Sequence, residues 1–292
     1  MIHMMKILVL GGTRFFGKRL VESLLQAGHD VTIATRGLKT DSFGSAVKRV
    51  VVDQEDEEML KEMLAGASYD VVYDNLCYSP NAAKVICKVL HSKVKKYIVT
   101  SSMAVYESAL SLKEDDFNPY QYPIVYGDRQ DFSYSEGKRL AEAVLFKHAT
   151  FPVIAVRFPV VIDENDYTKR LQFYVENIVK RKPFVVEDIE GKMSFIYEKE
   201  AGDFLAYLST MNIDGPINAC SNGVISMREV IHFVEKNTGI KACIEAKGEN
   251  MAPYNGMENC TINNTKAKEL GFQFRNLDTD VNGILKYYIE VM

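Results

Sequence analysis

Three side chains in two short segments are the best candidates for chemistry in this chain. Ser102 lies in the segment Thr100–Tyr106, and Tyr134 and Lys138 open a predicted helix. Residues four apart share one face of a helix, so the phenol and the ammonium should face the same ligand. A fixed cation lowers the pKa of a phenol from its usual value of ~10 towards neutrality. Such a phenol can exchange a proton with an alcohol, while the Ser102 hydroxyl orients the same oxygen.

The Tyr134/Lys138 pattern alone is weak evidence, because a chain of this composition should contain about one such pair by chance. The alternative is a surface tyrosine and lysine on an ordinary helix. Position favours chemistry, since the pair follows the fifth predicted strand and its serines and opens the helix before the sixth. Proton transfer beside a hydride carrier such as nicotinamide is the reaction that these groups suit.

Residues 6–25 predict a strand, a glycine turn and a helix. Ile7–Leu10 is an unbroken apolar run, and apolar side chains then recur at helical spacing from Phe16. The start of such a helix attracts anions, so we expect a dinucleotide's pyrophosphate to bind at Gly11, Gly12, Thr13, Arg14, Phe15, Phe16 and Gly17. The alternative is a turn without a ligand. Arg14 favours a phosphate, because a cation at the positive end of a helix is unfavourable unless an anion lies between.

The end of the second predicted strand, residues 29–34, indicates which dinucleotide fits. A carboxylate there would bind the ribose of NAD, but Thr35 occupies that position and Arg36 follows. An arginine suits the 2′-phosphate of NADP, so NADP is preferred and NAD is the alternative. A solvated arginine in a turn would also explain Arg36. Asp53, after the third strand, could accept from the adenine amino group or cap a helix.

The order of strand-like and helical patterns predicts an α/β fold. Strands are expected at 7–10, 29–34, 49–52, 70–73, 96–100 and 152–158, with helices at 16–25, 54–64, 82–90 and 135–148. This alternation is typical of a Rossmann-type, doubly wound parallel sheet that binds ligands at the carboxyl ends of its strands.

Beyond about residue 163 the alternation changes, which predicts a smaller C-terminal substrate-binding cap. Helices are expected at 171–180, 201–211, 226–237 and 280–291, with a strand at 193–197. Ser226 and Glu229 form a capping-box pattern at the start of the third of these helices. We therefore expect a dinucleotide-binding domain at 1–163 and a cap at 164–292, with parts near 194–222 returning to the sheet.

Composition narrows the classes of partner. The formal net charge of −4 makes nucleic acid an unlikely ligand, and no apolar run reaches the length of a membrane span. The five cysteines form no CxxC pair and the histidines no metal-ligand spacing, so we expect free thiols and no metal site. The start of the chain leaves no room for a signal peptide, which predicts a cytoplasmic protein.

The chain resembles the extended short-chain dehydrogenases/reductases, the NAD-dependent epimerase/dehydratase type. The likeness rests on GGTRFFG at 11–17, DVVYD at 70–74, SSMAVY at 101–106, YSEGK at 134–138 and AVRFPVVI at 155–162. It implies that Ser102, Tyr134 and Lys138 form a catalytic triad. It also implies an NAD(P)-dependent oxidoreductase or epimerase acting on a secondary alcohol or ketone, which could belong to a nucleotide-sugar. A homodimer through helices 82–90 and 135–148 is a further expectation.

The chain departs from this family at several positions. Arg14 resembles an atypical subgroup that includes chloroplast stem-loop RNA-binding proteins, and Met103–Ala104 replaces the Asp-Glu pair of dehydratases. Two arginines that usually hold a sugar nucleotide's diphosphate are replaced by Met193–Ser194 and Tyr254–Asn255. Lys192 or Arg275 could substitute for them. The alternative function is a non-catalytic NAD(P)-binding sensor or an RNA-binding relative.

Overall fold

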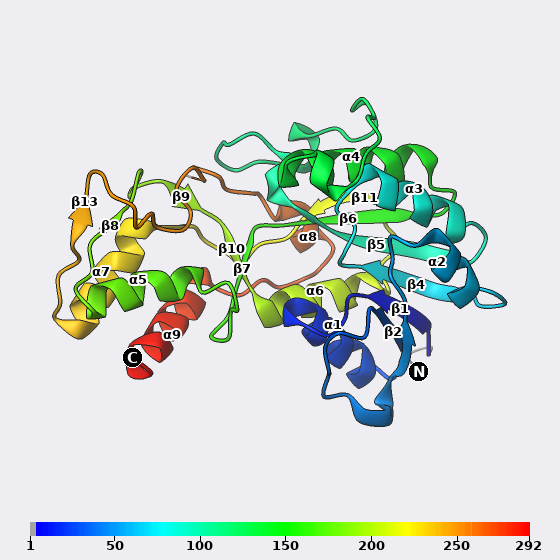
Figure 1. Ribbon diagram of the computed structural model, residues 1–292, viewed down its shortest axis with the longest axis horizontal. Helices are drawn as coiled ribbons and strands as arrows, with labels where there is room; N and C mark the ends of the chain where they lie inside the picture. Colours follow the sequence, from blue (N-terminus) through cyan, green and yellow to red (C-terminus); the bar gives the residue numbers. More distant parts are fainter. Residues whose placement is uncertain (1–3, 258) are drawn as a thin grey trace.

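A seven-stranded parallel sheet forms the centre of the computed structural model, which describes residues 4–257 and 259–292 (Figure 1). The strand order is β11-β6-β5-β4-β1-β2-β3. The strands are β1 (Lys6–Leu10), β2 (Asp30–Thr35), β3 (Lys48–Val51), β4 (Tyr69–Asp74), β5 (Val94–Ser102), β6 (Val153–Phe158) and β11 (Gly215–Asn218). The predicted Rossmann-type α/β fold is confirmed.

Helices cover both faces of this sheet (Figure 1). One face carries α1 (Phe15–Gln26) and α6 (Glu198–Leu208), and the other carries α2 (Glu57–Met63), α3 (Pro80–Val89) and α4 (Tyr134–His148). Successive side chains of β1 alternate between these two buried cores, with Ile7 and Val9 in one and Leu8 and Leu10 in the other. Burial on both faces explains why the inner strands read as continuous apolar runs.

The second half of the chain contributes to the sheet as well as to the cap. Strand β11 pairs in parallel with β6, and α6 packs along α1. The close approach of these helices depends on Gly202, since a Cβ there would lie 2.5 Å from the Cβ of Arg19. Residues 198–218 therefore belong to the central sheet and to the helices that cover it. The division of the chain into two domains at residue 163 stays a prediction.

The cap lies beside the sheet in Figure 1 and contains an apolar core of its own. Its helices are α5 (Arg170–Val179), α7 (Met227–Thr238) and α9 (Leu277–Glu290), and α8 (Thr265–Glu269) lies against β11. Its short strands are β7 (Val160–Ile162), β8 (Phe184–Val185), β9 (Lys192–Met193), β10 (Phe195–Tyr197), β12 (Ile225–Ser226) and β13 (Ile244–Glu245). Helix α7 begins with the predicted capping box, in which Glu229 N donates to Ser226 Oγ at 3.3 Å.

Several element boundaries differ from the sequence predictions by one to three residues, and two of the differences have clear causes in the contacts. The expected strand at 193–197 is divided, because β9 pairs with β12 while β10 pairs with β7, and buried Ser194 between them accepts a hydrogen bond from Ile262 N. Helix α2 begins at Glu57 rather than at 54, because Asp56 caps it by accepting from the amides of Glu58 and Met59.

Two further observations concern the chain as a whole. In residues 4–257 and 259–292, no helix is long and apolar enough to cross a membrane. All five cysteines are free thiols, and Cys243 alone among them is exposed.

Candidate functional site

Two cavities of similar size open near the carboxyl ends of the parallel strands. The first, of about 480 Å³, lies between the ends of β1, β2 and β3 and the segment after β4. The second, of about 540 Å³, lies between the end of β5, the start of α4 and the cap. The predicted site residues divide between these cavities and the protein interior.

In the turn at residues 11–17, the three glycine positions exclude a larger residue. Gly11 has a φ of +81°, which favours glycine, and a Cβ on Gly17 would lie 2.6 Å from the carbonyl oxygen of Gly11. A Cβ on Gly12 would lie 2.9 Å from Val21 Cγ2. Gly12 and Gly17 are buried and seat α1 against β1. These two glycines therefore shape the turn, and Gly11 is the glycine that lines the first cavity.

The other residues of the turn face both cavities. Thr13 and Arg14 line the first cavity, whereas Phe15 and Phe16 line the second. Arg14 holds the N-cap position of α1 in extended conformation, and its guanidinium lies 5.3 Å from the ring centroid of Tyr167. Because Tyr167 lines the second cavity, Arg14 stands at the border between the two.

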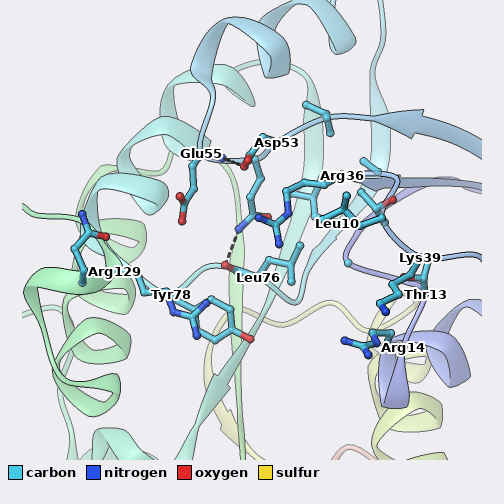
Figure 2. Close-up of a pocket in the computed structure, with 17 residues that line it drawn as sticks. Leu10, Thr13, Arg14, Arg36, Lys39, Asp53, Glu55, Leu76, Tyr78 and Arg129 are labelled. Atoms are coloured by element: carbon cyan, nitrogen blue, oxygen red, sulfur yellow. Dashed lines mark hydrogen bonds between the residues drawn. The ribbon is translucent and has the colours of Figure 1, made fainter. Parts of the chain in front are cut away.

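Positive charge gathers in the first cavity (Figure 2). Arg36 and Lys39, just after β2, line it and have no hydrogen-bond or ion-pair partner in the described chain. Thr35 carries no charge, and its Oγ1 accepts from Gly37 N at 3.2 Å. Two unpaired cations beside a neutral strand end form a site for a multiply charged anion such as phosphate.

Asp53 lines the same cavity and does not cap α2 (Figure 2). Its Oδ1 accepts from Glu55 N at 3.1 Å, which forms a turn ahead of the helix. Asp56 is the residue that caps α2. The helix-cap alternative for Asp53 is therefore wrong, and its carboxylate stays available at the cavity wall.

Lys138 lies behind the cavities rather than in them. Its side chain is buried, and Nζ donates to the carbonyl oxygens of Cys77 and Thr100, both at 2.8 Å. These bonds compensate for the loss of water around a buried ammonium. They use two of its three N–H donors, which leaves one for a ligand.

Tyr78 stands between Lys138 and the first cavity, and the sequence analysis missed it. Its ring centroid lies 4.2 Å from Lys138 Nζ. The same centroid lies 4.5 Å from the guanidinium carbon of Arg129, which lines the first cavity with Tyr78 (Figure 2). The ring of Tyr134 lies 6.2 Å away. Burial raises the pKa of Tyr78 to about 12, so its hydroxyl stays protonated at neutral pH. An aromatic residue shortly after the fourth strand was the available signal.

Ser102 and Tyr134 meet at the second cavity, which both residues line. Ser102 ends β5, and its Oγ accepts from Ala104 N at 3.1 Å, so its proton is free to donate to a ligand. Tyr134 is the first residue of α4, after the N-cap Ser133, and its side chain is 53% exposed. The structure thus brings the predicted serine and tyrosine to one cavity, with Lys138 one helical turn farther along α4.

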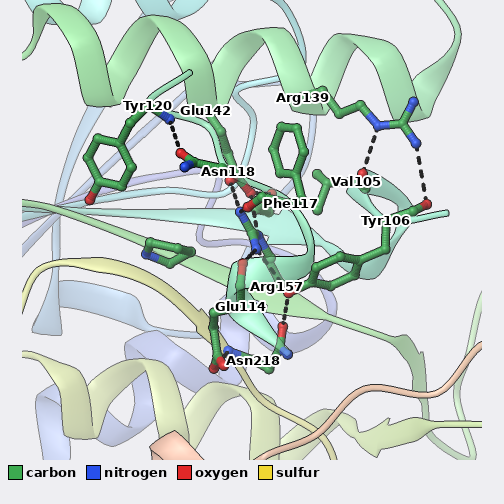
Figure 3. A network of polar contacts seen from close by, with 12 residues as sticks. Val105, Tyr106, Glu114, Phe117, Asn118, Tyr120, Arg139, Glu142, Arg157 and Asn218 are labelled. Atoms are coloured by element: carbon green, nitrogen blue, oxygen red, sulfur yellow. Dashed lines mark hydrogen bonds and ion pairs between the residues drawn. The ribbon is translucent and has the colours of Figure 1, made fainter. Parts of the chain in front are cut away.

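A buried network ties the middle of α4 to the sheet (Figure 3). Arg157 of β6 is fully buried and donates to Glu142 of α4 through Nη2 at 2.6 Å and Nε at 3.1 Å. Its Nη1 donates to Tyr106 Oη at 2.9 Å, and Tyr106 lines the second cavity and donates to Asn218 of β11. A fully partnered buried ion pair of this kind supports a precise position for α4.

Comparison with known proteins identifies the family. Residues 11–183 match the model of the NAD(P)H-binding family. The chain belongs to this NAD(P)H-binding family. The match begins at the glycine turn and includes the residues of the Rossmann sheet that line the two cavities. It extends into the cap beyond α5. The charges of unpaired Arg36 and Lys39 and the start of α1 fit the phosphate groups of such a dinucleotide.

Solved structures that contain NAD share the fold over the whole chain. MoeE5 in complex with UDP-glucose and NAD has a TM-score of 0.74 and 19% identity, covering 98% of this chain and 99% of that one. The Bordetella bronchiseptica enzyme WbmG in complex with NAD and UDP has a TM-score of 0.74 and 15% identity, covering 99% and 96%. Thermus thermophilus UDP-glucose 4-epimerase in complex with NAD has a TM-score of 0.71 and 15% identity, covering 99% and 100%. The predicted likeness to the extended short-chain dehydrogenase/reductase fold is confirmed.

One curated relative is similar in sequence over part of its length. The chloroplast stem-loop binding protein of 41 kDa b from Arabidopsis thaliana is 35% identical over 114 residues. The match covers 35% of this chain and 30% of that protein, so it spans less than a third of the relative's length.

The described side chains form no cluster suited to a metal ion. Across residues 4–257 and 259–292, no group of three or more His, Cys, Asp or Glu side chains is placed to hold one.

Proposed function

We propose that this protein is an NADP(H)-dependent oxidoreductase or epimerase that acts on a secondary alcohol or the corresponding ketone. The observation that carries the proposal is the meeting of Ser102 and Tyr134 at one cavity, with Lys138 one turn behind on α4. Membership of the NAD(P)H-binding family supports the hydride carrier that these groups require.

The first cavity supports the orientation of the cofactor and the preference for NADP. Its adenosine end would lie there, with Asp53 accepting from the adenine amino group and the pyrophosphate at the start of α1. Arg36 and Lys39 would bind the 2′-phosphate, since neither has another partner among the described residues. A carboxylate that would favour the free ribose hydroxyl of NAD is missing at Thr35.

The second cavity supports the assignment of proton transfer. The bound dinucleotide supplies or accepts the hydride. Tyr134 Oη gives its proton to the substrate oxygen during reduction and takes it back during oxidation, while Ser102 Oγ donates a hydrogen bond to the same oxygen. The remaining N–H of Lys138 binds the nicotinamide ribose.

Cofactor binding tests the proposal. NADPH titrated into the purified protein, followed by cofactor fluorescence, should bind at least tenfold more tightly than NADH, because one phosphate–arginine contact is worth about 1.5–3 kcal/mol. Equal affinity for the two would contradict the NADP preference, and no binding of either would contradict the proposed function. Mass spectrometry of the protein as purified would separate an epimerase, which retains its cofactor, from a reductase, which exchanges it.

Catalytic activity would separate the proposal from a dinucleotide sensor without chemistry. A sensor should bind NADPH as tightly as an enzyme but should not exchange hydride. Isotope exchange from NADP²H into ketones, measured with the wild-type protein, would support an enzyme. Binding without exchange over a broad panel of alcohols and ketones would favour the sensor.

A specific observation also raises RNA binding, namely the likeness to a protein named for stem-loop binding. The formal net charge of −4 disfavours it. Filter binding of a stem-loop RNA at two salt concentrations would decide, because contacts to phosphates weaken steeply with salt. Salt-sensitive binding that survives removal of NADP would favour the RNA function.

The homodimer through α3 and α4 is proposed on the resemblance alone. Light scattering during size-exclusion chromatography would measure the mass of the protein, for comparison with the 33.0 kDa of one chain. A monomer over the micromolar range would contradict the dimer without bearing on the chemistry.

A further inference from the structure

The second cavity contains one charged side chain among the described residues that line it, Arg170 at the start of α5. Its polar groups are otherwise hydroxyls and a thiol, and much of its wall is apolar or aromatic, including Phe15, Phe16 and Met257. Among the described residues, Arg170 is therefore the one cation in the lining of this cavity, and Arg14 stands at its border.

Two contacts hold the Arg170 guanidinium but leave its outer nitrogens free. Nε donates to Thr168 Oγ1 at 2.9 Å, and that hydroxyl in turn donates to Asp166 at 2.6 Å. The guanidinium carbon lies 5.7 Å from the ring centroid of Tyr254. Neither Nη nitrogen has a partner among residues 4–257 and 259–292. Two free, coplanar donors match the two oxygens of a carboxylate.

The cations that could have supplied a second positive charge are engaged elsewhere. Lys192 Nζ lies 2.8 Å from Glu229 Oε2, and Arg275 forms an ion pair with Asp280. Neither Lys192 nor Arg275 lines the second cavity. Neither residue therefore takes the place of the missing arginines in the lining of the second cavity. Tyr254, at one of the positions where related enzymes carry an arginine, instead supports Arg170 with its ring.

We infer that the substrate carries one carboxylate, which Arg170 binds, and that it is not a nucleoside diphosphate derivative. The inference rests on the proposed function, because it places the reacting oxygen at Ser102 and Tyr134. The apolar walls receive the body of the substrate between that oxygen and the acid group. A diphosphate would place at least two negative charges against one guanidinium, with little other compensation for lost hydration.

Binding to the NADP⁺-saturated protein tests this inference without turnover. The probes are 4-acetylbenzoate and 4-acetylbenzamide, which have nearly the same shape but differ in charge, and UDP-glucose is the third ligand. Calorimetry should show the acid binding at least tenfold more tightly than the amide. Arg170→Gln should abolish that difference, and Arg170→Lys should retain part of it, because the lysine keeps the charge but loses the fork.

Arg228→Gln is the matched control. Arg228 lies on the exposed surface of α7, forms an ion pair with Glu190 and lines neither cavity. It should leave acid binding unchanged, and equal thermal midpoints would show that the variants fold alike. Acid binding that Arg170→Gln does not weaken, or UDP-glucose binding more tightly than the acid, would overturn the inference. A protein that fails to bind NADP⁺ at the outset would instead overturn the proposed function.

Discussion

The two cavities are similar in volume, about 480 and 540 Å³, but differ in charge. The first is lined by four cationic side chains, Arg14, Arg36, Lys39 and Arg129, and by the carboxylates Asp53 and Glu55. The second is lined by Arg170 as its one charged side chain among the described residues. The difference indicates that binding strength for a polyanion is concentrated in the first cavity. Under the proposed function, the second cavity places a less charged molecule against the hydroxyls of Ser102 and Tyr134.

Tyr78 marks the boundary between these regions. Its ring lies near both Lys138 and Arg129, and also near the ring of Tyr134. A dinucleotide that extends from the first cavity to the Lys138 ammonium must therefore pass along this ring. Four predictions follow, of which the first two separate chemistry from cofactor binding and the last two concern stability.

Tyr134→Phe should have the largest effect. It removes the exchangeable proton at the second cavity and leaves the first unchanged, so hydride transfer should fall by about 10²–10⁴-fold while NADPH affinity changes little. Single-turnover kinetics with the identified substrate would measure the first effect and fluorescence titration the second. Phe132→Leu, beside the helix but outside both cavities, is a control. Turnover within tenfold of wild type for Tyr134→Phe would contradict the role of the phenol.

Arg36→Gln should act on the other cavity. NADPH affinity should fall by about 10–100-fold while NADH affinity stays nearly constant, since the 2′-phosphate is the group that loses a charge-assisted contact. Lys39→Gln should give a smaller loss of the same kind, because lysine binds phosphate as a point charge. Lys48→Gln, which breaks an exposed ion pair with Asp30, is the control. An equal loss for NADH would show that Arg36 does not distinguish the two cofactors.

Gly17→Ala should weaken both binding and stability through the shared turn. The new methyl group would lie 2.6 Å from Gly11 O, so α1 must move away from β1. We expect a loss of about 1–3 kcal/mol in the free energy of unfolding, measured with urea. Gly283→Ala in α9 meets no atom within 4 Å and should stabilise by up to about 1 kcal/mol. Equal stability of the two variants would argue against tight packing at the turn.

Glu198, the first residue of α6, gives a prediction on the pH dependence of stability. Burial, with the nearby Asp163 charge, raises the pKa of Glu198 from 4.5 to about 8. The folded state thus keeps a proton that the unfolded state loses, so the free energy of unfolding should fall as pH rises from about 4.5 to 8. Glu198→Gln should flatten this slope in urea unfolding series, whereas the exposed Glu190→Gln should not. An unchanged slope would place the titration elsewhere.

The regular parts of the fold could be predicted because burial on both faces leaves a clear apolar signature in β1, β4 and β6. The glycine turn and the opening of α4 follow local rules of turns and caps. The residues brought together by the cap could not be predicted in this way. Arg170 meets Tyr254 only through tertiary packing, and Tyr78 acquires its role from two cations distant in sequence. Short strands such as β8 and β13 carry too few residues to show a period.

The return of α6 to the sheet also governs how this polypeptide can be divided. A chain ending at residue 163 would lack α6, which packs with Leu20 and Leu24 of α1 and with Val9 of β1. It would also lack β11, which pairs with β6. Such a fragment would expose an apolar surface and an unpaired strand edge, which would promote aggregation during synthesis. The amino-terminal half should therefore reach its stable fold only after residues 198–218 have left the ribosome.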